Sequence, residues 1–321
     1  MKKYIHKVLV IFVILAAIAV SVEMLISYRL NQKHQYYVQG DWHMLEGHNS
    51  ELLFVGNSRT YKHVDPIFLD SALHTTSEVI AQDGQTIDFI WVKFREYTKV
   101  NSAPKEIYVQ TDHFTLFLHD KLYGIQNISP YFFMKRIDLS DLSTKGGYHS
   151  YYTYLPMMAM KFEYIRKMIL DDTLKNYSFK KNRGAELVDQ EWSGDWQNTP
   201  EVTFDPEHPC LRFIDSFFNY CKTNNVKLNF IFPPMSAPSL KNIKASDRIE
   251  QVIAKKSVKY GYPAHYRNYT DTTLYNDSTL FYNHMHMNRR GVKVFMHQLL
   301  SDPEIFTSFR QLTDITGSNT Q

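Results

Sequence analysis

The chain has 321 residues, of which 44% are hydrophobic and 21% charged, and its net charge is +3 with neutral histidine. These values are typical of a globular protein that forms one large domain or two small ones. The positive excess is small, and neither a long basic run nor a recognition motif accompanies it. The composition therefore argues against nucleic-acid binding.

The first residues predict a membrane helix. A basic tail, MKKYIHK, precedes an apolar run from Val8 to Ile26 that only Ser21 and Glu23 interrupt. Nineteen helical residues rise about 28 Å, close to the roughly 30 Å hydrocarbon thickness of a bilayer. The lysines of the tail favour a cytoplasmic N-terminus. A signal peptide cleaved near residues 19–21 is the alternative, and both interpretations place the rest of the chain outside the cytoplasm.

The remainder divides into a polar juxtamembrane connector and one α/β domain. We assign residues 1–27 to the cytoplasmic tail and transmembrane anchor, 28–48 to the connector and 49–321 to the domain. Apolar strands are expected at 52–55, 78–81, 106–114 and 226–234. Helices are expected at 87–97, around the two cysteines, and at 246–258 and 288–300. Strands that alternate with helices predict a parallel sheet covered on both faces, which is a three-layer α/β/α architecture.

The alternation stops in an insert at about residues 120–205. Ten of the 45 residues from 121 to 165 are Phe or Tyr. Such a stretch suits a helical cap over a site, or a surface that faces a membrane or a partner. It is equally compatible with aromatic side chains that pack the insert's own small core.

The two cysteines, Cys210 and Cys221, fall in one predicted amphipathic helix, PCLRFIDSFFNYCKTNN. Eleven helical residues separate two Cα atoms by about 16 Å, whereas a disulfide needs roughly 4.4–6.8 Å. We therefore expect two small core residues and no disulfide.

A candidate nucleophile follows the first strand. The segment LLFVGNSRT, which begins at Leu52, runs through Gly56 to Ser58. This serine would lie at the carboxyl end of a strand, where open α/β sheets bind ligands. A serine hydroxyl is a weak nucleophile and needs a base within hydrogen-bond distance. The best candidate base is His286, in the distant segment NHMHMNRRGVKVF.

Metal binding is the other interpretation of this second segment. His284 and His286 are two residues apart and could ligate a metal, but no second ligand pair with zinc spacing occurs in the sequence. We therefore expect neither a metal nor another cofactor.

The two segments resemble the first and last motifs of the SGNH/GDSL hydrolase superfamily. VGNSRT is similar to the G-x-S-R variant of the membrane-anchored, acyl-transfer branch, and NHMHMNRRGVKVF is similar to D-x-x-H-L-N-x-x-G-A. The resemblance covers about residues 50–115 and 210–300, with VKLNFIFPPMS as the penultimate strand. It implies that Ser58 is the nucleophile, that His286 is the base, and that Asn283 stands in the place of the acid.

The sequence departs from the family's pattern at that acid. Asn283 occupies a position where Asp is expected. An amide can orient an imidazole, as the asparagine of Cys-His-Asn sites does. It cannot neutralise the charge of an imidazolium. Asp277 is an alternative source of negative charge if its loop folds back.

The oxyanion hole also departs from the pattern. The resemblance implies that the backbone N–H groups of Ser58 and Gly84 hold the oxyanion. Asp112 stands where an asparagine completes this hole in the family, and a carboxylate there would repel an oxyanion unless it is protonated or turned away. Arg59 either contacts the substrate or pairs with a neighbouring carboxylate.

Relatives with this layout include polysaccharide O-acetylation proteins and the D-alanyl-lipoteichoic acid transfer protein. The resemblance implies an extracytoplasmic serine esterase or O-acyltransferase that acts on acyl esters of a cell-envelope polysaccharide. It also implies a membrane-bound O-acyltransferase as partner, with residues 8–26 in the lipid bilayer. The alternative is a catalytically degenerate domain that binds glycan or scaffolds a membrane complex.

Overall fold

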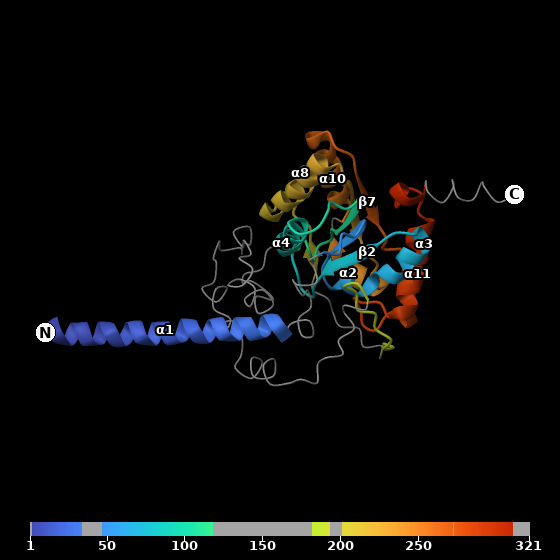
Figure 1. Cartoon of the computed structure of the whole chain (residues 1–321). Helices are drawn as coiled ribbons and strands as arrows, with labels where there is room; N and C mark the ends of the chain where they lie inside the picture. Colours follow the sequence, from blue (N-terminus) through green and yellow to red (C-terminus); the bar gives the residue numbers. More distant parts are fainter. Residues whose placement is uncertain are drawn as a thin grey trace.

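The computed structural model, drawn in Figure 1, describes residues 2–33, 47–117, 182–192, 201–244, 246–271 and 273–310. The predictions for most of the connector and most of the aromatic insert lie outside the described residues. The described part contains the predicted nucleophile, base and oxyanion residues.

Five parallel strands form the central sheet, in the order β2-β1-β3-β5-β7. They are β1 Leu52–Gly56, β2 Ser77–Ala81, β3 Glu106–Gln110, β5 Lys227–Phe232 and β7 Ala264–Asn268. A second parallel sheet pairs β4 Val202–Thr203 with β6 Ile243–Lys244. In the central sheet the strand order reverses between β1 and β3. Open α/β sheets bind ligands beyond the carboxyl ends of strands at such a reversal, and β1 leads directly into Ser58.

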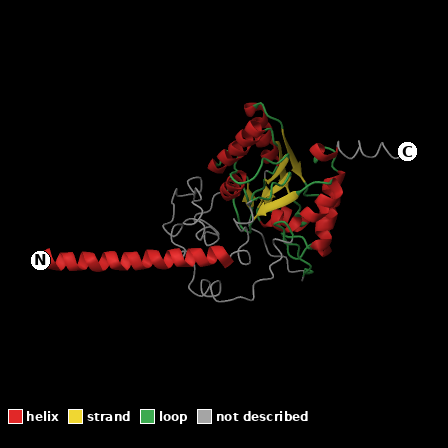
Figure 2. Ribbon diagram, in the orientation of Figure 1, coloured by secondary structure: helices red, strands yellow, loops and turns green. Residues whose placement is uncertain are grey.

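Helices cover both faces of the central sheet (Figure 2). One face carries α4 Ile87–Thr98, α8 Arg212–Asn224 and α10 Asp247–Tyr260, and the other α2 Ser58–His63, α3 Pro66–Leu73 and α11 Arg289–Ser301. Successive residues of a strand point to opposite faces. In β1, Leu53 and Val55 enter the first core and Leu52 and Phe54 the second. The predicted three-layer α/β/α architecture is therefore confirmed.

The remaining described helices are short. They are η5 Pro209–Leu211, α9 Ala237–Leu240, η6 Leu274–Asn276 and η7 Ser278–Leu280. Cys210 lies in η5 and Cys221 in α8, and both thiols are buried and unpaired. Burial in the apolar core raises the pKa of the Cys210 thiol to about 12, so both cysteines behave as small core residues.

The N-terminal helix α1 spans Lys2–Lys33 as one continuous element (Figure 1). Its segment Lys3–Leu25 is long and apolar enough to cross a membrane, with a mean hydropathy of 2.9. The predicted N-terminal apolar helix is confirmed, and the direction in which it would cross the membrane stays a prediction.

Several strands differ from the sequence prediction. The strand expected at 106–114 ends at Gln110, because the Asp112 carboxylate accepts the N–H groups of Phe114 and Thr115 and closes a turn. The sequence also does not predict the two-residue strands β4 and β6, or strand β7. The residues of β7, AHYRN, are mostly polar and lie at the sheet edge, so they show no apolar run.

Candidate active site

A tight turn after β1 presents the candidate nucleophile. Asn57 caps α2 by accepting the N–H of Arg59 at 3.2 Å, and Ser58 is the first residue of that helix. The turn requires glycine before it, because a Cβ on Gly56 would lie 2.0 Å from Thr60 Oγ1 and 2.6 Å from Gln110 Oε1. The nucleophile turn is thus packed directly against the end of β3.

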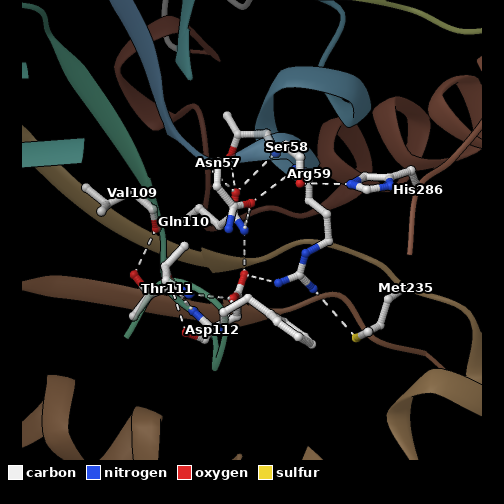
Figure 3. Close-up of polar contacts among 12 residues, drawn as sticks. Asn57, Ser58, Arg59, Val109, Gln110, Thr111, Asp112, Met235 and His286 are labelled. Carbon is white, nitrogen blue, oxygen red and sulfur yellow. Dashed lines mark hydrogen bonds and ion pairs between the residues drawn. The ribbon is translucent and has the colours of Figure 1, made fainter. Parts of the chain in front are cut away.

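Gln110, the last residue of β3, organises this turn. Its Oε1 accepts the N–H groups of Asn57 and Thr60, at 3.0 and 3.1 Å, and the Thr60 hydroxyl at 2.7 Å. Its Nε2 donates to Asn57 Oδ1 at 2.6 Å and to Asp112 Oδ2 at 2.5 Å. The side chain is fully buried, and Figure 3 shows it between the turn and Asp112.

Ser58 is the one residue of this turn that reaches solvent. Asn57, Arg59 and Thr60 are at most 4% exposed, whereas Ser58 is partly exposed. Among the described residues the Ser58 N–H has no hydrogen-bond acceptor, while the amides of its three neighbours are satisfied. The hydroxyl and its own amide are therefore both available to a ligand.

The candidate base faces this hydroxyl. His286 Nε2 lies 2.8 Å from Ser58 Oγ (Figure 3). On the other side of the ring, His286 Nδ1 lies 3.1 Å from Asn283 Oδ1. Because an amide oxygen only accepts, Nδ1 carries the ring proton, and the lone pair of Nε2 points at the serine hydroxyl. The structure thus brings together the three residues of the predicted Ser-His-Asn set.

The loop that carries His286 is held on several sides. Asn283 Oδ1 also accepts the N–H groups of Met285 and His286, both at 2.9 Å, so it closes the loop on itself. The hydroxyls of Ser236 and Ser239 donate to the carbonyl oxygen of His284, at 2.6 and 2.8 Å. An antiparallel bridge between Phe281 and Met287 closes the base of the loop. These contacts restrict the imidazole position before any substrate binds.

The surroundings of His286 disfavour its charged form. Burial, and then the positive charges of Lys62, Arg59 and His284, lower the pKa of His286 to about 3. The Tyr282 ring stacks on the imidazole, with centroids 5.6 Å apart and planes 13° apart. At neutral pH His286 is therefore uncharged and free to accept a proton, although its basicity is low.

Asp112 corrects the prediction for the oxyanion hole. Its carboxylate is fully buried and forms an ion pair with Arg59, whose guanidinium lies over the rings of Phe114 and Phe232. The same carboxylate also accepts the N–H of Thr115. Because its oxygens are occupied in this way, Asp112 lies in the support beneath the turn and is not directed at an oxyanion (Figure 3). Of the two predictions for Arg59, the pairing with a carboxylate is confirmed.

The two other predicted residues occupy separate loops. Gly84 follows β2 in a turn with φ +69°, a conformation that glycine adopts without strain. Burial of the ring, and then the charge of neighbouring Asp83, raise the pKa of the Tyr282 phenol. The turn that contains Gly84 therefore lies near the site. Asp277 is exposed and caps η7 by accepting the N–H of Thr279 at 2.9 Å. The His286 Nδ1–H donates to Asn283 Oδ1.

Three residues of the site were missed from the sequence. Gln110 lies inside an apolar strand pattern, Tyr282 is one of many aromatic residues, and His63 belongs to no motif. Within the described part of the chain, no group of three or more His, Cys, Asp or Glu side chains could hold a metal ion.

Comparisons with known proteins add little to this geometry. No family model and no curated protein matches the chain. A crystal structure from Bacteroides fragilis NCTC 9343, described as a "putative acylhydrolase", is similar over 83% of this chain and 89% of its own, at 12% identity and a TM-score of 0.36. The site itself carries the functional argument.

Proposed function

We infer that this protein is a serine hydrolase or O-acyltransferase of acyl esters that uses Ser58 as nucleophile and His286 as base. The observation that carries the proposal is the 2.8 Å contact between Ser58 Oγ and His286 Nε2, with Asn283 on the other ring nitrogen. A nucleophile in contact with a base, and a base oriented by a third group, is the arrangement that activates a serine.

The reaction would begin when Ser58 Oγ attacks an ester carbonyl and His286 Nε2 takes the hydroxyl proton. The C–O bond to the leaving alcohol then breaks, and His286 returns the proton to that alcohol. Water completes a hydrolysis and a sugar hydroxyl completes a transfer, through the same steps in reverse order. The N–H of Ser58, which has no acceptor among the described residues, would donate to the oxyanion. The N–H of Gly84 is the second candidate donor.

The charges around the site suit this chemistry in one respect and oppose it in another. Burial and then the charges of Lys62 and Arg59 make a positive imidazolium unfavourable, so the pKa of His286 is low. The same charges favour the negative oxyanion that forms with it. A cation and an anion appear together in the tetrahedral state, so their attraction offsets part of the cost of protonating His286.

The substrate class comes from the family resemblance of the two motifs and from the N-terminal helix. An anchored domain outside the cytoplasm would meet acyl esters of a cell-envelope polysaccharide. A membrane-bound O-acyltransferase is the partner that the resemblance implies. Both assignments belong to the proposal.

Labelling with a fluorophosphonate probe tests the proposed chemistry. The probe reacts only with an activated serine hydroxyl, so we expect one label per chain, on Ser58. Ser58→Ala should abolish labelling, and Ser301→Ala, which removes an exposed hydroxyl on α11, should leave it unchanged. Ser58→Ala and His286→Ala should lose similar ester-cleavage activity, and the double variant little more, because the two residues act as one unit. Losses that multiply would contradict a shared proton.

A binding module is the second candidate function, and Asn283 in the place of Asp is the observation that favours it. Without a carboxylate the imidazolium lacks its usual stabilisation. If the probe leaves Ser58 unlabelled while the protein still binds acylated glycan, the binding module is the correct assignment.

A further inference from the structure

The buried residue His63 connects the helix of the nucleophile with the loop of the base. It is the last residue of α2, and Ser58 is the first. Its Nε2 lies 3.0 Å from the backbone nitrogen of Met287, the residue after His286. The His63 and His286 rings meet edge to face, with centroids 6.1 Å apart. Helix α2 thus contacts the base loop at both of its ends.

The direction of this hydrogen bond identifies the state of the His63 ring. The Met287 N–H can only donate, so His63 Nε2 accepts and the ring proton lies on Nδ1. A protonated ring would present an N–H to the Met287 N–H and break the contact. His63 is 0% exposed, and burial lowers its pKa well below 6.5, so the neutral ring persists.

The Nδ1 atom of His63 shows that this residue was not placed for packing alone. Nδ1 is buried and has no hydrogen-bond partner among the described residues. An unpaired buried donor is unfavourable, and such groups are rare in folded proteins and call for an explanation. A leucine would fill the same position in the core without that cost. What histidine supplies and leucine cannot is the acceptor for the Met287 amide.

The remaining anchors of the base loop come from elsewhere. Asn283 holds the loop to itself, and Ser236 and Ser239 hold the carbonyl of His284. Among the described contacts that fix the loop backbone, the bond to His63 is the one that reaches the helix of Ser58. It therefore bears on the distance between Ser58 Oγ and His286 Nε2.

We propose that His63 is a positioning residue of the Ser58–His286 pair, which fixes the base loop on the nucleophile helix through the Met287 amide. The inference rests on the proposed function. It assigns His63 no contact with substrate, so its effect belongs to kcat and to the rate of serine labelling, and KM stays nearly unchanged.

Two amide variants provide a matched test. In His63→Gln the side-chain oxygen is as many bonds from Cα as Nε2 is and can accept the Met287 N–H. In His63→Asn the side-chain oxygen reaches only as far as Nδ1 does, so it cannot accept the Met287 N–H. Both variants bury one amide, and His63→Asn should lose more thermal stability because it leaves the buried Met287 N–H unpaired. We expect His63→Asn to lower the rate of fluorophosphonate labelling and the kcat for p-nitrophenyl acetate by about 100-fold, the loss that a misplacement of about 1 Å can cause. His63→Gln should retain most of the wild-type labelling rate and kcat.

Hydrogen exchange at the Met287 amide reports the bond without activity. We expect fast exchange in His63→Asn and slow exchange in the wild type and in His63→Gln, at a temperature where all three are folded. Equal labelling rates in the two variants, with a reactive wild type, would overturn the proposal for His63 alone. A wild type whose Ser58 does not react would overturn the proposed function, and the role of His63 with it.

Discussion

Asn283 defines the chemistry of the site more than any other single residue. Its Oδ1 receives three donors, the N–H groups of Met285 and His286 and the ring Nδ1–H. All three contacts go to oxygen, so an aspartate would make them equally well. The geometry of a Ser-His-Asp triad is therefore present, and the negative charge is missing.

Asn283→Asp should consequently raise the pKa of His286 from its low value of about 3. A carboxylate 3.1 Å from Nδ1 stabilises the imidazolium, and an opposite charge at such a distance shifts a pKa by roughly 1–3 units. The rate of ester cleavage at neutral pH should rise with it. NMR titration of the imidazole and the acidic limb of the pH–rate profile measure the two effects.

Asp277→Asn is the matched control for that experiment. Asp277 is exposed and its carboxylate caps η7, so removing its charge should leave the pKa of His286 unchanged. If Asp277→Asn instead reduces activity as much as His286→Ala does, Asp277 supplies the charge and Asn283 does not define the base.

His63 and His286 also predict how stability depends on pH. Burial lowers the pKa of His286 to about 3 and that of His63 well below 6.5. As the pH falls below about 6.5, the unfolded chain takes up protons on both residues. In the folded chain both side chains stay neutral to lower pH, and His286 does so until the pH nears 3. The unfolded state then binds more protons, so the free energy of unfolding falls with decreasing pH. Urea unfolding at pH 7 and pH 5 should show the loss, and His63→Gln should make it smaller.

At the scale of elements, the site depends on how β1, β3 and α2 meet. Gln110 at the end of β3 binds both ends of the nucleophile turn, and the Arg59–Asp112 pair lies beneath it. Both members of that pair are fully buried. Burial lowers the pKa of the Arg59 guanidinium, and the carboxylate of Asp112 raises it again, so the charged pair is maintained.

The buried pair should show strong coupling between its members. Arg59→Met leaves the Asp112 carboxylate buried without its cation, a change that costs about 3–5 kcal/mol. Adding Asp112→Asn removes the unpaired charge. The double variant should therefore lose less free energy of unfolding than the two single variants lose together. A double-mutant cycle from urea unfolding measures this coupling. Additive losses would mean that water or another group compensates for Asp112.

The sequence predicted these elements where the chemistry is local. Apolar runs located β1, β2 and β5, and the glycine and serine after β1 located the candidate nucleophile. The prediction failed where the role of a residue depends on a tertiary contact. Gln110 lies in an apolar strand as an ordinary polar residue, and only the fold places it under the turn. The motif places Asp112 in the oxyanion hole. Its ion pair with Arg59 could not be predicted, because it depends on the packing of β3 beside α2. His63 gives no sequence signal, since its partner is a backbone amide 224 residues away.

At the scale of the whole molecule, the site joins segments from opposite ends of the domain. The strand order reverses between β1 and β3, so the carboxyl end of β1 lies at the point where open α/β sheets bind ligands. The chain returns through α8, β5, α10 and β7 before it reaches the base loop and α11. The distance of 228 residues between Ser58 and His286 therefore follows from an ordinary α/β winding.

The N-terminal helix determines where this site would work. Its segment Lys3–Leu25 could cross a bilayer, and the lysines before it favour a cytoplasmic N-terminus. A reporter such as alkaline phosphatase, which needs disulfides and an oxidising compartment, should be active when fused after Gln321. Green fluorescent protein fused at the same place should fluoresce poorly if the fusion is exported by the general secretory route. N-terminal sequencing of the mature protein then separates the two interpretations of the helix. An intact Met1 or Lys2 indicates an anchor, and a terminus near Val22 indicates a cleaved signal peptide. A fluorescent green fluorescent protein fusion together with an inactive alkaline phosphatase fusion would place the domain inside the cell. A cell-envelope substrate would then be excluded.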